Sequence, residues 1–227
     1  MDNLEKSKET ITGQETGLSL EELNRIAVEI NNTSPNSYGD IAHAEFGWLY
    51  FPGRPLQPLK SRTDNIIAVA FMSVGSAFFP EAFSGTDAIA VVHNHPNGHI
   101  SPSIEDVNWL LDSVAENGKL KYELIAATNL EKVTGFYELQ FLGERSKTRD
   151  LIQKNKDLSA DRIRKKREWL DQHPEIKRKM LPGQYFLSPA EHNQLAKDAI
   201  AGSLIVGRAR PLSGFRLEKD HFVTILP

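Results

Sequence analysis

Apolar residues recur at helical spacing in two well-separated segments of the chain. The first segment predicts a helix over 19–30, where Ser19 and Glu22 have the pattern of a capping box. Its apolar positions are Leu20, Leu23, Ile26, Ala27 and Ile30. The second predicts a helix over 103–117, because apolar residues again share one face and Gly118 follows as a stop signal.

Shorter apolar runs without helical periodicity predict strands between and after these helices. The predicted strands are 46–51, 65–74 (one strand or a bent pair), 88–92, 122–127, 136–141, 185–187, 203–206 and 222–226. A third helix is predicted over 188–202, with Ser188 as N-cap and Glu191 as its capping-box partner. This mixture predicts an α+β fold in which a mixed β-sheet is flanked by helices.

The composition changes sharply after residue 143. Residues 144–179 contain 13 Lys/Arg and 7 Asp/Glu, whereas the whole chain carries a net charge of −3. We predict a charged helical arm there, built from one helix or a helix pair. The predicted division is a frayed N-terminus (1–18), a catalytic domain (19–143), the basic arm or linker (144–182) and a small α/β C-terminal subdomain (183–227).

Several classes of chemistry are excluded by composition. The sequence has no cysteine, which excludes disulfides, a thiol nucleophile and thiolate metal ligands. The polar N-terminus has no apolar core of a signal peptide, and no run of about 18 apolar residues occurs. We therefore expect a cytoplasmic protein without a membrane span, in which any metal is held by histidine, carboxylate or water.

Candidate metal ligands follow the predicted strand 88–92. His93 and His95 lie two residues apart at its end, so their imidazoles point to one face. Asp106 falls in the first turn of the next predicted helix, where a carboxylate is stabilised by the helix dipole. Two histidines and one aspartate, with a fourth position open to water, are typical of a catalytic zinc site.

Each part of this candidate metal site also has a simpler interpretation. Ser103 and Asp106 alone have the pattern of an ordinary helix-start signature, and a histidine after a strand is usually a polar loop residue. The combination of these parts is far rarer. His93, His95, the proline that follows, Ser103 and Asp106 fix five positions, which occur together by chance less than roughly once in a million start points. His99 fits neither spacing, and we assign it to the loop.

The motif His-x-His-Pro, followed after six residues by Ser-x-x-Asp, resembles the JAMM motif of the JAB/MPN metalloenzyme family. Asn94 and the segment NGHISPS (97–103) are similar to its prokaryotic RadC-like branch. The resemblance covers about residues 19–141. It implies a cytidine-deaminase-like JAB/MPN core and one Zn²⁺ per chain bound by His93, His95 and Asp106. The implied reaction is hydrolysis of an amide or isopeptide bond by zinc-activated water.

The same resemblance implies two further catalytic residues. Ser103 matches the family serine that supports the oxyanion, and a glutamate upstream serves as general base. Glu45, directly before the predicted strand 46–51, is our candidate for that base. Asp40 and Glu81 are rivals, and the absence of any base would make the chain an inactive relative.

Three functions remain open at this stage. The first is a metallo-isopeptidase or peptidase acting on a protein or peptide, for example a ubiquitin-like conjugate or precursor. The second is a catalytically inactive binding or scaffold module with the same fold. The third is a RadC-like association with DNA, for which the basic arm is weak support, because charge-rich helices are usually solvated faces and Trp169 is its only aromatic residue.

Overall fold

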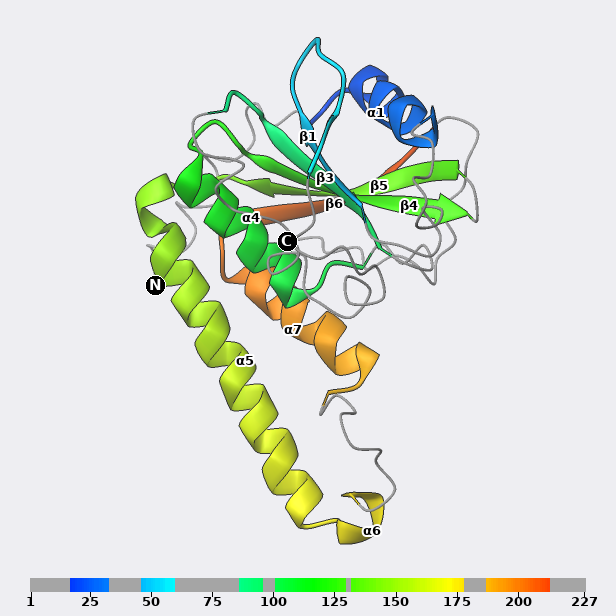
Figure 1. Cartoon of the computed structure of the whole chain (residues 1–227). Coiled ribbons are helices and arrows are strands. Elements are labelled where there is room, and N and C mark those ends of the chain that lie inside the picture. The colour runs from blue at the N-terminus through cyan, green and yellow to red at the C-terminus, as the bar shows by residue number, and fades with distance from the viewer. Residues whose placement is uncertain are drawn as a thin grey trace, which may run out of the picture.

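A computed structural model of the chain describes residues 17–32, 46–59, 86–95, 101–129, 132–177 and 187–212 (Figure 1). Its helices are α1 (Leu20–Asn32), α4 (Ile104–Glu116), the 3-10 turn η3 (Arg145–Lys147), α5 (Thr148–Asp171), α6 (Pro174–Lys177) and α7 (Pro189–Ala201). Its strands are β1 (Gly47–Tyr50), β2 (Gln57–Pro58), β3 (Ala90–Asn94), β4 (Tyr122–Asn129), β5 (Lys132–Phe141) and β6 (Ile205–Pro211).

The strands form one mixed sheet of six, in the order β2-β1-β3-β4-β5-β6. β3 and β4 are parallel, while the other neighbouring pairs are antiparallel. A parallel pair requires a crossover connection, and α4 provides it. Since α4 runs back along the sheet, its first turn lies near the end of β3, where the candidate ligands are.

Helices cover both faces of this sheet (Figure 1). On one face α1 buries Leu23, Ile26 and Ile30 against the sheet side that includes Trp48 and Leu124. On the opposite face α4, α5 and α7 pack over residues that alternate with these along the strands. That second cluster includes Leu49, Val91, Ile125, Val107, Leu195 and Ile152. The alternation follows from the two-residue repeat of a strand.

The structure confirms the predicted α+β class with a mixed sheet and flanking helices. The predicted helix starts are also confirmed, because Ser19, Ser103 and Ser188 each accept a hydrogen bond from the backbone amide three residues later. One detail of the first helix differs. The apolar repeat included Leu20, which is 45% exposed, so the buried stripe of α1 begins at Leu23.

The C-terminal segment contributes to the common sheet. We predicted a small α/β C-terminal subdomain over 183–227, and in its described part β6 pairs with β5 as an edge strand of that sheet. α7 packs against α4 and α5 on the same face. β4 and β5 are also longer than predicted, because their hairpin continues toward residues 129 and 132. The predicted strands 65–74 and 222–226, and most of 185–187, lie outside the described residues.

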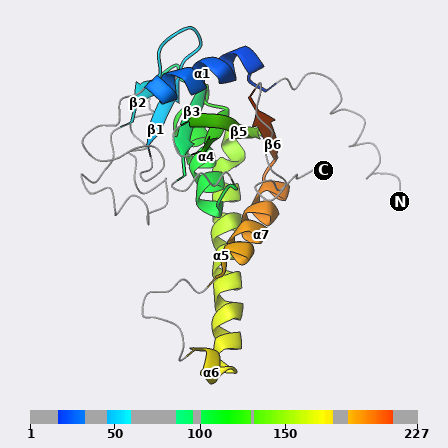
Figure 2. The same cartoon turned by 90° about the vertical axis from the view of Figure 1, so that its right-hand side faces the viewer.

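The predicted arm is one long helix, α5, with the short α6 at its far end. Arg162 and Lys166 form ion pairs with Asp198 and Glu191 of α7, so α5 is tied to the body as far as Lys166. Beyond these contacts α5 and α6 extend away from the sheet in both views (Figures 1 and 2). Among the described residues, no helix is both long enough and apolar enough to cross a bilayer.

A buried carboxylate fastens both ends of the described chain to β5. Glu138 is fully buried, and its Oε2 accepts from the Leu18 amide at 3.1 Å and from Arg210 at 3.0 Å. Arg210 also donates to the Leu18 carbonyl at 2.6 Å. Burial raises the pKa of Glu138, and the charges of Arg210 and Arg208 oppose that rise. The entry to α1 and strand β6 therefore depend on one charge pair.

Replacing Arg210 by methionine would leave the buried Glu138 carboxylate with Arg208 as its remaining charged partner. We expect Arg210→Met to lower the free energy of unfolding by about 3 kcal/mol in urea titrations. The matched control is Arg164→Met on α5, whose ion pairs with Asp161 and Glu168 are exposed. It should change stability far less than Arg210→Met does, because exposed ion pairs contribute little, and equal effects of the two variants would contradict this role of Arg210.

Candidate metal centre

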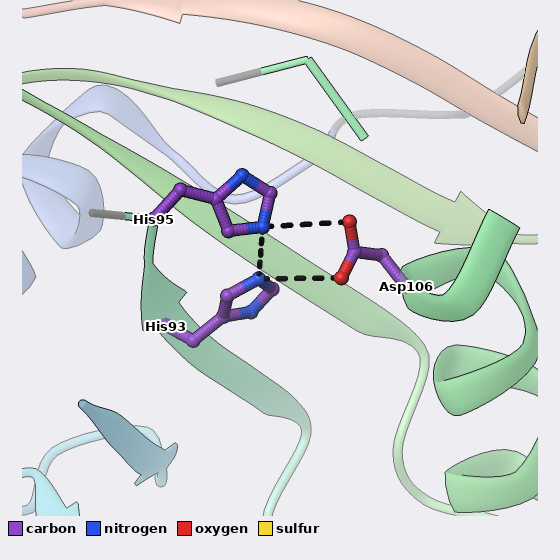
Figure 3. A group of neighbouring side chains, drawn as sticks. All are labelled: His93, His95 and Asp106. Atoms are coloured by element: carbon purple, nitrogen blue, oxygen red, sulfur yellow. Dashed lines mark hydrogen bonds and ion pairs between the residues drawn. The ribbon is translucent and has the colours of Figure 1, made fainter. Parts of the chain in front are cut away.

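The candidate ligands come together where β3 ends and α4 begins. His93 is the fourth residue of β3 and is fully buried, and His95 follows the strand with 16% of its side chain exposed. Asp106 lies in the first turn of α4 and is 1% exposed. The three side chains point toward one another from these two elements (Figure 3). The predicted convergence of the three ligands is thus observed.

The donor atoms lie at similar distances from one another. His93 Nε2 is 3.1 Å from His95 Nε2 and 3.6 Å from Asp106 Oδ1. His95 Nε2 is 3.5 Å from Asp106 Oδ2. Tetrahedral coordination with bonds near 2.1 Å separates neighbouring ligand atoms by about 3.4 Å. The spacing therefore fits a small divalent cation, and the buried group could hold a metal ion.

Asp106 has a second contact that orients its carboxylate. Its Oδ2 accepts from the Ser103 amide at 2.6 Å and from the Ser103 hydroxyl at 2.9 Å, while its own amide donates to Ser103 Oγ at 3.1 Å. This reciprocal pair is a capping box, which satisfies free amides at the start of α4. Because these contacts occupy Oδ2, Oδ1 is the oxygen with more free acceptor capacity for a cation.

Electrostatic interactions keep the His93 imidazole and the Asp106 carboxylate in the protonation states that bind cations. Burial lowers the pKa of His93 to about 3, an effect that Asp106 opposes and His95 reinforces. For Asp106, burial acts to raise the pKa, but His95, His93 and the Ser103 amide together lower it to about 2. At neutral pH His93 is therefore neutral and Asp106 is ionised. Metal ligands need these forms.

The predicted catalytic residues are described only in part. Ser103 lies beside Asp106, where its hydroxyl is used in the capping box, so the helix-start interpretation holds and the oxyanion role stays a prediction. Glu45, its rivals Asp40 and Glu81, and the loop residue His99 lie outside the described residues.

Three neighbours of the ligands also shape the site; Trp109 and Glu123 were not singled out from the sequence, and Asn94 was named only for the motif resemblance. Asn94, buried between the two histidines, accepts a hydrogen bond from the Phe46 amide at 2.8 Å through its Oδ1. The Trp109 ring meets His93 edge-on, with centroids 5.7 Å apart and an interplanar angle of 84°. Glu123 of β4 is fully buried, with Oε1 3.6 Å from His93 Nδ1. Glu123 could have been identified from the sequence as an acidic residue inside an otherwise apolar strand.

Comparison with known proteins gave no significant match, whether to protein-family models, to curated proteins or to solved structures. The function of this chain is therefore inferred from its own residues and from the geometry of the site.

Metal analysis tests the centre directly. We expect about one zinc ion per chain after dialysis against trace zinc, measured by elemental analysis, because three ligands converge on one point. His93→Ala and Asp106→Ala should each lose the ion. The control is His173→Ala, which removes an exposed histidine stacked on Trp169 at the end of α5. Equal zinc content in all four proteins would mean that the ion binds elsewhere.

Proposed function

We propose that this chain is a zinc-dependent hydrolase of the JAMM type that cleaves an amide or isopeptide bond. The observation that carries the proposal is the convergence of His93, His95 and Asp106 on one point. Structural zinc sites normally have four protein ligands, whereas three ligands with an open position are typical of catalytic sites. The partial exposure of His95 supports access from solvent on that side.

The choice of zinc follows from the donor chemistry. Zinc accepts imidazole nitrogens and carboxylate oxygens in tetrahedral geometry, whereas Mg²⁺ and Ca²⁺ prefer oxygen ligands alone. When bound, zinc supplies Lewis acidity, which makes water acidic enough to serve as a nucleophile near neutral pH. The mixed sheet between helices is also compatible with the JAB/MPN core that the motif resemblance implies.

The protein residues would divide the proton chemistry between them. Glu45 takes the proton from the attacking water and later delivers it to the departing amine. Ser103 donates a hydrogen bond to the oxyanion that develops on the scissile carbonyl. In that step the Ser103 hydroxyl must turn its proton away from Asp106 Oδ2, to which it donates in this structure.

Support for Glu45 comes from the residues that follow it. Phe46, the next residue in the chain, donates its amide to Asn94 between the two histidines. Gly47 pairs with His93 across the antiparallel β1–β3 ladder. Consecutive Cα atoms are about 3.8 Å apart, so Glu45 is attached to backbone that borders the candidate ligands.

The substrate we propose is a protein or peptide, for example a ubiquitin-like conjugate or precursor, an inference that rests on the motif resemblance. The arm gives little support to the nucleic-acid alternative. Arg162, Arg164, Lys165 and Lys166 all form ion pairs with acidic residues of α5 or α7. Such pairing reduces the positive charge that could neutralise phosphates.

The test of the hydrolase is a cleavage assay with zinc-loaded protein and a panel of ubiquitin-like proteins joined through their C-terminus to a fluorogenic amine. Glu45→Gln should retain zinc but lower cleavage by about 10²- to 10⁴-fold, because the amide cannot accept the proton. Asp40→Asn and Glu81→Gln are the controls and should cleave at the parent rate. Cleavage by Glu45→Gln at that rate would rule out our assignment of the base.

Ser103 can be separated from a purely structural cap by a matched pair of variants. Ser188 forms an equivalent capping box with Glu191 on α7. Ser103→Ala and Ser188→Ala should each cost about 1 kcal/mol of unfolding free energy. Only Ser103→Ala should reduce cleavage, by about 10²- to 10³-fold, because it alone removes an oxyanion donor. Unchanged turnover in Ser103→Ala would show that this serine is a cap and nothing more.

A further inference from the structure

Glu123 occupies a position where a carboxylate is costly. It lies in β4 next to Leu124, Ile125 and Ala126, and all four side chains are almost completely buried. Moving a carboxylate from water into a protein interior costs several kcal/mol unless nearby groups compensate. A valine or isoleucine would suit this strand better. The glutamate therefore calls for a reason beyond packing.

The sheet register brings Glu123 to the candidate metal centre. Glu123 pairs with Val91 in the parallel β3–β4 ladder, and His93 is two residues farther along β3. Residues two apart on a strand share a face, so Glu123 and His93 are diagonal neighbours on the face covered by α4. Glu123 Oε1 lies 3.6 Å from His93 Nδ1. This distance is within the range of an ion pair but is longer than a hydrogen bond.

The His93 ring is thus placed between two carboxylates, one toward each nitrogen. Nε2 faces Asp106 Oδ1 and His95 Nε2, at 3.6 and 3.1 Å. Nδ1 faces Glu123 on the opposite side of the ring. The edge-on contact with Trp109 restricts rotation of the imidazole between them. One nitrogen can therefore bind a cation while the other points at an acceptor.

A neutral imidazole carries one proton, and its location decides which nitrogen can bind a metal. A carboxylate beside Nδ1 stabilises the tautomer with the proton on Nδ1. The lone pair is then on Nε2, which faces the other two ligands. The same carboxylate makes the imidazole more basic and a better ligand.

From this geometry we infer that Glu123 is a positioning residue for the metal centre, which holds the proton of His93 on Nδ1 and directs Nε2 to the cation. Glu123 does not bind the metal itself, since the imidazole stands between them. The inference rests on the metal centre of the proposed function, but not on hydrolysis.

The test is the affinity of the full chain for Zn²⁺, measured by competition with a chromophoric chelator. Glu123→Gln keeps the shape of the side chain but removes its charge, and should weaken zinc binding by about 10- to 100-fold. The matched control is Glu138→Gln, which neutralises an equally buried glutamate on the neighbouring strand β5, in contact with arginines rather than histidine. It should leave the zinc affinity unchanged.

The outcomes separate this inference from the proposed function. Parent affinity in Glu123→Gln, or an equal loss in Glu138→Gln, would overturn the positioning role while leaving the zinc centre intact. No zinc binding by the parent would overturn the centre and the inference together. A selective loss in Glu123→Gln without any peptidase activity in the parent would uphold the inference and reject the hydrolase.

A second measurement uses the parent protein, so it tests the inference even if Glu123→Gln fails to fold. Long-range ¹H–¹⁵N correlation spectra of the zinc-loaded chain report the tautomer of each histidine, and the His93 signals are those missing from His93→Ala. We expect a proton on Nδ1 and coordination through Nε2. A proton on Nε2 would mean that Nδ1 is the coordinating atom or that Glu123 donates to it, and either result overturns the proposal.

Discussion

The parallel pairing of β3 with β4 is the constraint on which the candidate site depends. Parallel strands must be joined by a crossover, so the chain leaves β3, forms α4 and returns to start β4 beside β3. This path places the end of one strand and the first turn of a helix at the same edge of the sheet. Open α/β sheets commonly bind ligands at such edges. His93, His95 and Asp106 meet there because of the connection, although 10 residues separate the last two in sequence.

The cost of this arrangement is a polar cluster inside an apolar layer. His93, Asp106 and Glu123 are nearly inaccessible and lie on the face that Val91, Ile125 and Val107 also line. Polar groups in such surroundings destabilise a fold unless they are well compensated. The capping box of Asp106 recovers part of this cost, because the same carboxylate supports the start of α4. Local folding and the chemistry of the site are therefore joined in one side chain.

The sequence alone was sufficient for features that depend on short-range patterns. Apolar spacing predicted α1 and α4, and capping signatures predicted the first residues of both and of α7, because these patterns are determined within a few residues. The candidate metal ligands were also found this way, since His93 and His95 are two apart and Asp106 belongs to a helix start. Contacts between distant segments were not predictable. Glu123 is brought to His93 only by strand register, and β6 joins the sheet only through pairing with β5.

The long helix α5 has a consequence for the hydrodynamic behaviour of the protein. At about 1.5 Å per residue its 24 residues span roughly 36 Å, a length comparable to the diameter of a small domain. Its ion pairs with α7 reach as far as Lys166, and beyond them the end of α5 and the short α6 extend away from the body (Figures 1 and 2). Friction rises with such asymmetry, and a monomer elutes from a sizing column as a larger sphere would. Light scattering measures molar mass independently of particle shape, so it is the appropriate way to determine how many chains a particle contains.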